Sequence, residues 1–153
     1  QIIGMSALKY FLLRVDPKKN MLFDPKESID FNGNTGPFIQ YGYVRTQAIL
    51  RKVDFDYSHS VPDSLSQEER NLIQTVLNFP QVLTEAQQGY NASLVAGYAY
   101  DLVRDFNSFY QSSPILREPN DNQKSFRLQL TFQVGAIVKN AMRILGIQMP
   151  QRM

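Results

Sequence analysis

The chain has 153 residues, 43% hydrophobic and 20% charged, and its 10 Phe and 8 Tyr exclude an intrinsically disordered protein. It contains no cysteine, which excludes disulfides and thiolate chemistry and favours a reducing compartment, the cytoplasm by default. The net charge of +2 is unevenly distributed: no Asp or Glu follows Asp121, so residues 122–153 carry +5 and the first 121 residues carry −3.

The chain begins with a short predicted helix. Its apolar residues follow helical spacing and are Ile3, Ala7, Leu8, Phe11 and Leu12. The helix should end before Asp16-Pro17, because proline disfavours a helical conformation at the residue before it. Residues 18–25 are predicted to form a loop and residues 26–31 a brief helix, which Asn32-Gly33-Asn34 would terminate.

The next predicted helix has clear boundaries. Thr35 can cap it, Pro37 lies in its first turn, and it continues to Lys52. The apolar side chains that we expect along it are Phe38, Ile39, Tyr41, Val44, Ala48 and Ile49. Residues 54–63 show no period and are predicted to be an exposed connection.

Two shorter helices are predicted after this connection. Ser66 and Glu69 have the spacing of a capping box, in which the serine oxygen accepts from the amide three residues on and the glutamate bonds back to the serine amide. The first helix carries Leu72, Ile73, Val76 and Leu77, and Phe79-Pro80 ends it. The apolar positions of the second are Val82, Leu83, Ala86 and Tyr90.

Two long helices are predicted to complete the chain. Asn91 caps the first, whose apolar face comprises Leu94, Val95, Tyr98, Leu102, Val103, Phe106 and Tyr110. Residues 111–122 form a loop, and the final helix spans residues 123–145 until Gly146 stops it. Its inward positions are Leu130, Val134, Ile137, Val138, Ala141 and Leu145. No segment alternates as a strand does, so the predicted fold is an all-α antiparallel helical bundle.

The sequence offers no catalytic motif. The scattered glycines form no phosphate loop or dinucleotide fingerprint, and a single histidine, His59, excludes a multi-histidine metal site. We interpret His59 as a solvated loop residue. The acidic pairs Asp54/Asp56, Glu68/Glu69 and Asp101/Asp105 are expected to be a turn, helix-start charges and a solvated face in that order. No segment approaches the roughly 20 apolar residues of a membrane span, so no membrane association is expected.

RNA binding requires cations for phosphates and flat or polarisable side chains on which unpaired bases stack. The helix predicted over residues 35–52 has Tyr41 beside Arg45, Arg51 and Lys52. For Tyr41 and Tyr110, packing in the core is an alternative, since both lie on apolar stripes. For the acid-free residues 122–153, a solvated basic helix packed on an acidic neighbour is an alternative. Met153 lies beyond the final helix, where periodicity gives it no core role.

The residues Thr35-Gly36-Pro37-Phe38-Ile39-Gln40-Tyr41, Arg45 and Ile49-Leu50-Arg51-Lys52 resemble the start of the arginyl-tRNA synthetase anticodon-binding domain. The C-terminal half agrees: Phe106-Asn107-Ser108-Phe109-Tyr110, Met142-Arg143-Ile144-Leu145-Gly146-Ile147 and Pro150-Gln151-Arg152-Met153 resemble the same family. Two departures exist. Ser6-Ala7-Leu8-Lys9 replaces Asp-Ala-Leu-Arg, which affects whichever contact that Asp makes with the catalytic domain, and Gln151 replaces a glutamate.

The resemblance implies a C-terminal domain that binds the anticodon loop of the tRNA for arginine, within a class I arginine–tRNA ligase. Residues 1–30 would form the junction with the catalytic domain and residues 31–153 the anticodon-binding bundle. The resemblance assigns contact with anticodon-loop bases to Tyr41, Tyr110 and Met153, with Arg45, Arg143 and Arg152 as supporting cations. The sequence has no metal site and no cofactor site of its own. The parent would use ATP with Mg in its catalytic domain, and we expect a monomer.

Two other functions fit parts of the sequence. A protein-interaction bundle could dock an acidic partner on its basic final helix, and a free-standing enzyme could use His59 or a carboxylate pair. The absence of an initiator methionine suggests a piece of a longer protein, or a processed one.

Overall fold

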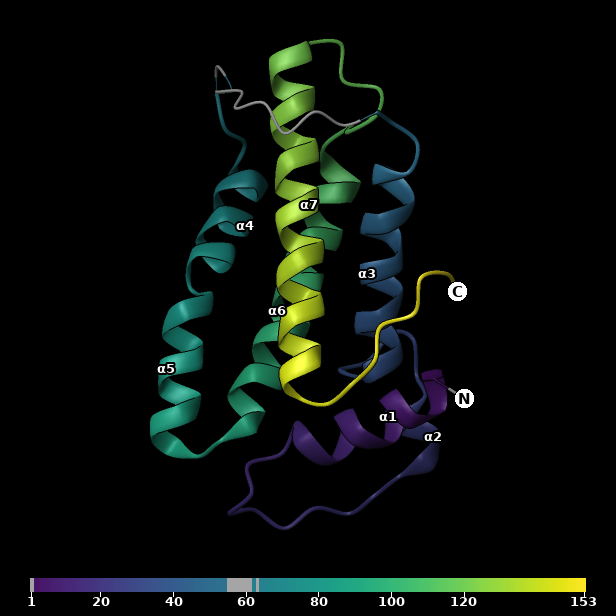
Figure 1. The fold of residues 1–153 in the computed structure, drawn as a ribbon, viewed down its shortest axis with the longest axis vertical. Coiled ribbons are helices and arrows are strands. Elements are labelled where there is room, and N and C mark those ends of the chain that lie inside the picture. The colour runs from purple at the N-terminus through teal and green to yellow at the C-terminus, as the bar shows by residue number, and fades with distance from the viewer. Residues whose placement is uncertain (1, 55–61, 63) are drawn as a thin grey trace.

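A computed structural model describes residues 2–54, 62 and 64–153 of the chain (Figure 1). Within these residues every regular element is a helix, which confirms the predicted all-α class. In chain order the helices are α1 (Ile2–Leu13), α2 (Pro25–Ser28), α3 (Gly36–Leu50), α4 (Gln67–Leu77), α5 (Phe79–Gly89), α6 (Ala92–Ser112) and α7 (Asp121–Ile144).

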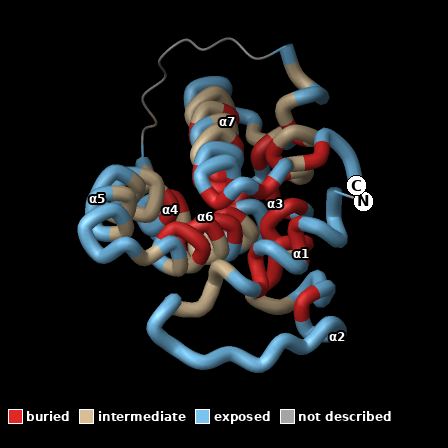
Figure 2. The backbone as a smooth tube through the Cα atoms, turned by 60° about the horizontal axis from the view of Figure 1, so that its bottom comes forward, coloured by how far each residue is buried: buried red, intermediate tan, exposed pale blue. Residues whose placement is uncertain are grey.

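Three long helices, α3, α6 and α7, form the centre of the bundle (Figure 1). Helices α4 and α5 pack on one side of α6, and α1 lies across the end of the bundle against the start of α3. Buried residues concentrate on α1, α3, α6 and α7, while the connection between α1 and α2 is exposed (Figure 2). The largest fully buried side chains include Tyr10, Ile39, Leu102, Phe106 and Phe109.

The predicted caps define the helix starts. The Thr35 hydroxyl accepts from the Phe38 amide at 3.2 Å, and both bonds of the Ser66/Glu69 capping box are present. Asn91 caps α6 as predicted. The last helix begins two residues earlier than predicted, because the side chain of Asn120 accepts from the amide of Gln123.

Gly146 ends α7 as predicted. Its φ of +68° lies in the left-handed region, which favours glycine. The amide of Gly146 bonds to the Arg143 carbonyl at 3.0 Å and that of Ile147 to the Met142 carbonyl at 2.8 Å. This is the Schellman pattern, which satisfies the last carbonyls of a helix and turns the chain away.

The apolar stripe predicted for the first helix is only partly correct. Ala7 and Phe11 are buried, but Ile3, Leu8 and Leu12 are exposed. Tyr10 takes the core position instead, because its hydroxyl lies within hydrogen-bonding distance of Asn34 Oδ1 (2.6 Å) and the Ala96 carbonyl (2.9 Å). Burial raises the pKa of this hydroxyl, which therefore stays protonated and able to donate.

Other predicted positions also differ. The brief helix predicted over residues 26–31 ends at Ser28. Leu77, at the end of α4, and Tyr90 are 71% and 90% exposed and do not face inward. Tyr90 follows the last residue of α5 with a φ of 48°, so its side chain leaves the helix stripe that periodicity assigned to it. Leu94 is also exposed, in the first turn of α6.

Candidate nucleic-acid interface

Arg45 joins two tyrosines from different helices. Tyr41 and Arg45 lie one turn apart on α3, and Tyr110 lies near the end of α6. The guanidinium carbon of Arg45 is 4.9 Å from the centre of the Tyr41 ring and 5.1 Å from that of the Tyr110 ring. Its Nη1 donates to Oδ1 of Asn107, one turn before Tyr110 on α6. We call Tyr41, Arg45, Asn107 and Tyr110 the Arg45 cluster.

The Arg45 cluster presents its rings to solvent. Tyr41 is 47% exposed and Tyr110 is 42% exposed, so the alternative that both rings pack in the core is wrong. The ring of buried Phe106 stacks against that of Tyr110, with the ring centres 6.3 Å apart. Neither tyrosine hydroxyl has a hydrogen-bond partner among the described residues. The cluster therefore offers flat surfaces beside a cation that no carboxylate neutralises within the described part of the chain.

A close approach of α3 to α6 brings the cluster together. A Cβ at Gly42 would lie 2.3 Å from Cγ1 of Val103, closer than any real contact. Only glycine therefore fits at this position, next to Tyr41 in α3. The helices meet closely enough for one arginine on α3 to span the distance between the two rings.

The C-terminal tail, residues 146–153, is bonded to α1, to α3 and to the residue that follows α3 (Figure 1). Lys9 Nζ donates to the Gly146 carbonyl at 2.7 Å, and Nε2 of buried Gln40 donates to the Gln148 carbonyl at 2.8 Å. Arg51 Nη1, just past the end of α3, donates to the Gln151 carbonyl at 3.2 Å. The tail therefore ends beside the helix that carries Tyr41 and Arg45, with Arg152 and Met153 exposed.

Gln40 and Arg51 have roles that the sequence did not reveal. Arg51, a candidate cation for phosphates, donates a hydrogen bond to the tail. The only local sign of Gln40 was its place in the Gly-Pro-Phe-Ile-Gln-Tyr segment, because its partner lies 108 residues away.

Arg143 lies apart from the cluster. It is exposed in the last turn of α7. Helices α6 and α7 are consecutive and antiparallel, so Tyr110 near the end of α6 lies towards the start of α7, at the other end of the bundle from Arg143 (Figure 1). Of the six predicted binding residues, Tyr41, Arg45 and Tyr110 are in contact with one another through Arg45. Arg152 and Met153 lie in the tail, which is bonded to α3 and to Arg51.

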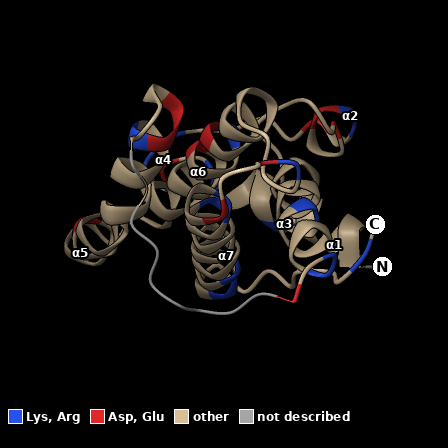
Figure 3. Cartoon of the chain, turned by 90° about the horizontal axis from the view of Figure 1, so that it is seen from above, with Lys and Arg blue, Asp and Glu red and all other residues tan. Residues whose placement is uncertain are grey.

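Arg127, one of the basic residues of the acid-free stretch 122–153, is neutralised inside the protein. It is 9% exposed, its Nε lies 2.7 Å from Glu69 Oε1, and its Nη1 bonds to Glu118 and to the Pro114 carbonyl. Gln123 also donates to Glu69, whose side chain is fully buried. The alternative of a basic residue packed on acidic neighbours therefore holds for Arg127. The remaining charges do not form a continuous basic stripe along α7 (Figure 3).

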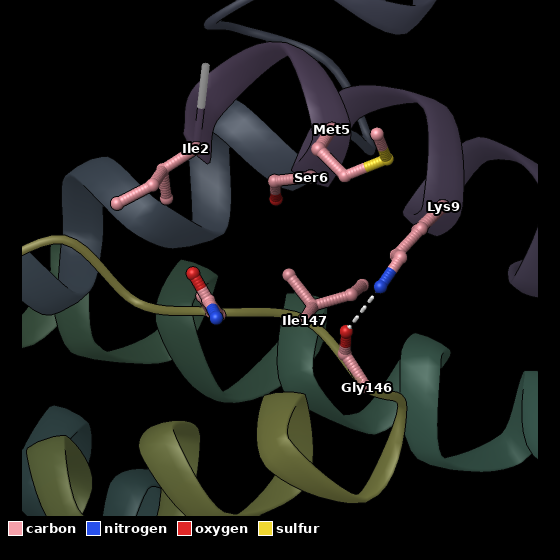
Figure 4. Close-up of a pocket in the computed structure, with 7 residues that line it drawn as sticks. Ile2, Met5, Ser6, Lys9, Gly146 and Ile147 are labelled. Carbon is pink, nitrogen blue, oxygen red and sulfur yellow. Dashed lines mark hydrogen bonds between the residues drawn. The ribbon is translucent and has the colours of Figure 1, made fainter.

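A hollow of about 280 Å³ lies between α1 and the tail (Figure 4). Ser6, at the position where the family has Asp, lines it and is 2% exposed. A Cβ at Gly36 would meet the Ser6 backbone and hydroxyl at 2.6 Å, so Ser6 packs against the first turn of α3. Within the described residues, the Ser6 side chain therefore faces α3 and the tail.

Of the other candidate groups, Glu69 and the Asp101/Asp105 pair have structural partners. Asp101 and Asp105 both pair with Arg104, at 2.9 and 3.4 Å. His59 and Asp56 lie outside the described residues. Among the residues described, no three His, Asp or Glu side chains are grouped to hold a metal ion. No helix in the same residues has the length and apolar character needed to cross a membrane.

Comparison with known proteins gives consistent matches. Residues 39–153 match the DALR anticodon binding domain. The chain is 52% identical to the arginine–tRNA ligase of Phocaeicola vulgatus, over 100% of this chain and 26% of that protein, and 48% identical to that of Flavobacterium psychrophilum, over 99% and 25%. It thus spans about a quarter of these relatives.

Solved structures are similar over almost the whole chain. The arginyl-tRNA synthetase of Thermus thermophilus superposes with a TM-score of 0.92 at 26% identity, covering 99% of this chain and 27% of that one. The arginyl-tRNA synthetase of Plasmodium falciparum gives 0.83 at 31% identity, covering 97% and 26%.

Proposed function

Because the chain belongs to the DALR anticodon-binding domain family, we propose that it binds the anticodon loop of the tRNA for arginine as a domain of an arginine–tRNA ligase. The parent protein would join arginine to that tRNA with ATP and Mg in a separate catalytic domain. We further propose that it works in the cytoplasm as a monomer.

The observation that carries the proposal is the Arg45 cluster. Unstacked anticodon-loop bases would pack on the exposed faces of Tyr41 and Tyr110, and each such stack contributes about 1–3 kcal/mol. Arg45, held in place by Asn107, would meet the phosphates of the same nucleotides. A planar guanidinium suits this task because it can stack on a ring and still donate hydrogen bonds.

The tail and Arg143 would extend the contact. Met153 supplies a polarisable thioether and Arg152 a cation, next to α3. Arg143, at the far end of α7, would reach RNA outside the bases that Tyr41 and Tyr110 bind. The bound RNA would therefore run along the bundle beyond the cluster.

Residues 1–30 would form the junction with the catalytic domain, and residues 31–153 the anticodon-binding bundle. The exposed apolar side chains of α1 support this division, because several exposed apolar side chains on one helix are typical of protein contact. They are Ile2, Ile3, Met5, Leu8 and Leu12.

Anisotropy titrations with the tRNA for arginine and with a duplex RNA of the same length test the proposal. We expect clear preference for the tRNA, and Tyr110→Ala should weaken its binding about tenfold or more. Deletion of Arg152 and Met153 should also weaken it. Tyr90→Ala removes an exposed tyrosine outside the cluster and should leave the affinity for the tRNA unchanged. Equal binding of both RNAs would instead favour a basic docking surface for acidic proteins.

A further inference from the structure

A cavity of about 330 Å³ adjoins the Arg45 cluster. Its walls come from Lys52, just past the end of α3, from Tyr110, and from the turn formed by residues 113–117 after α6. Ile115 in this turn is 4% exposed and belongs to the hydrophobic core, so the base of the cavity is anchored. We call it the Tyr110 pocket.

Two cations, Lys52 and Arg117, line the Tyr110 pocket. Both residues are exposed, and neither side chain has a hydrogen-bond or ion-pair partner among the described residues. Other arginines nearby in sequence differ, since Arg104 pairs with two aspartates and Arg127 with two glutamates. The pocket thus combines two available positive charges with an aromatic ring and apolar walls.

We propose that the Tyr110 pocket binds one unpaired nucleotide of the RNA, with the base against Tyr110 and the phosphate between Lys52 and Arg117. This inference rests on the proposed function. Tyr110 belongs to both the pocket and the Arg45 cluster, so an RNA loop lying on the cluster reaches the pocket along one continuous surface. The volume is near the lower limit of small-ligand sites, about 300 Å³, and suits a single nucleotide.

The chemistry of the walls favours a nucleotide over an acidic peptide. A flat base gains from the ring and the apolar turn, while a carboxylate side chain would use only the cations. Phosphate oxygens accept several charge-assisted hydrogen bonds at once, which matches a lysine and an arginine facing the same space.

The first test compares the salt dependence of tRNA binding for the wild-type chain and for K52Q/R117Q. Loss of one bridged phosphate should make the negative slope of log K against log salt shallower by about 0.7 and weaken binding about tenfold at low salt. K18Q/K19Q, which removes two exposed lysines in the connection between α1 and α2, is the matched control. The single variant R117K keeps both positive charges and should retain the wild-type salt dependence.

The second test identifies the nucleotide. Each loop base is replaced in turn by an abasic site, and one position should lose less affinity in K52Q/R117Q than in the wild-type chain. If K52Q/R117Q kept the wild-type salt dependence and the same loss of affinity at every abasic position, the proposal that the Tyr110 pocket binds a nucleotide would be wrong. If Tyr41→Ala still weakened binding, the proposed function would stand without the pocket. If the wild-type chain showed no preference for the tRNA over duplex RNA, both the proposed function and the pocket proposal would be wrong.

Discussion

Arg45 and Arg127 are the centres of two polar clusters with opposite character. Arg127 is almost fully buried, and its donors meet Glu69, Glu118 and a backbone carbonyl. Arg45 is half-buried between two exposed rings, and the one hydrogen-bond partner found for it among the described residues is the neutral amide of Asn107. One arginine has its charge neutralised inside the protein, and the other has no carboxylate partner among the described residues.

The difference shows what a count of charges along the chain misses. Arg127 lies in the acid-free residues 122–153, which suggested an anionic partner, yet it serves the fold. Arg45 lies in a part of the chain whose net charge is negative. The availability of a cation for RNA depends on its neighbours in space, and these come from distant elements.

The largest expected effect is on the fold. Arg127→Ala would leave the fully buried Glu69 carboxylate without its cation, and such a loss typically costs about 3–5 kcal/mol. The free energy of unfolding, measured by denaturant titration, should fall by that amount. Arg104→Ala removes an exposed arginine with two carboxylate partners and should cost under about 1 kcal/mol. If both variants lost the same free energy of unfolding, Arg127 would be no more important for the fold than an exposed arginine.

The helices and their limits follow largely from local signals. Thr35, Ser66, Asn91 and Gly146 act on amides or carbonyls within a few residues, so sequence alone predicted them. The ion pair of Arg127 with Glu69 spans 58 residues, and no local pattern encodes it.

Local periodicity also failed for the candidate site. It placed Tyr41 and Tyr110 on apolar stripes and could not tell a stripe's exposed edge from its buried centre. The resemblance to the family, not periodicity, singled out these residues, and the contact of both rings with Arg45 became visible only once α3 and α6 were placed together.

The next effect concerns how the Arg45 cluster is assembled. Gly42→Ala would place a Cβ 2.3 Å from Val103, and such overpacking costs about 1–3 kcal/mol. Because α3 and α6 would have to separate, affinity for the tRNA should fall together with stability. Gly97→Ala, with nothing within 4 Å of the added Cβ, should instead stabilise the chain by up to about 1 kcal/mol. If Gly42→Ala lowered stability but left tRNA affinity unchanged, RNA binding by the Arg45 cluster would not depend on the close spacing of α3 and α6.

A smaller effect distinguishes Arg45 from Arg127 directly. Arg45→Met should weaken tRNA binding about tenfold and make the negative slope of log K against log salt shallower by about 0.7, because one phosphate contact is lost. The free energy of unfolding should change by less than about 1 kcal/mol, since the removed charge has no buried counterion. Arg45→Lys keeps the charge and should retain the salt slope. A stability loss of several kcal/mol would make Arg45 a structural arginine like Arg127.

The smallest effect tests which part of each tyrosine acts. Neither the Tyr41 nor the Tyr110 hydroxyl has a partner among the described residues, so Tyr41→Phe and Tyr110→Phe should change the free energy of unfolding by less than about 0.5 kcal/mol. If the rings serve for stacking, tRNA affinity should also stay within about twofold, since phenylalanine presents the same flat face. Tyr98→Phe is the contrasting variant, because its hydroxyl donates to the Thr75 carbonyl at 2.9 Å and its loss should cost about 1 kcal/mol of stability. A tenfold loss of tRNA affinity in either cluster variant would mean that a hydroxyl reads a base edge, and the cluster would then select nucleotides by hydrogen bonding.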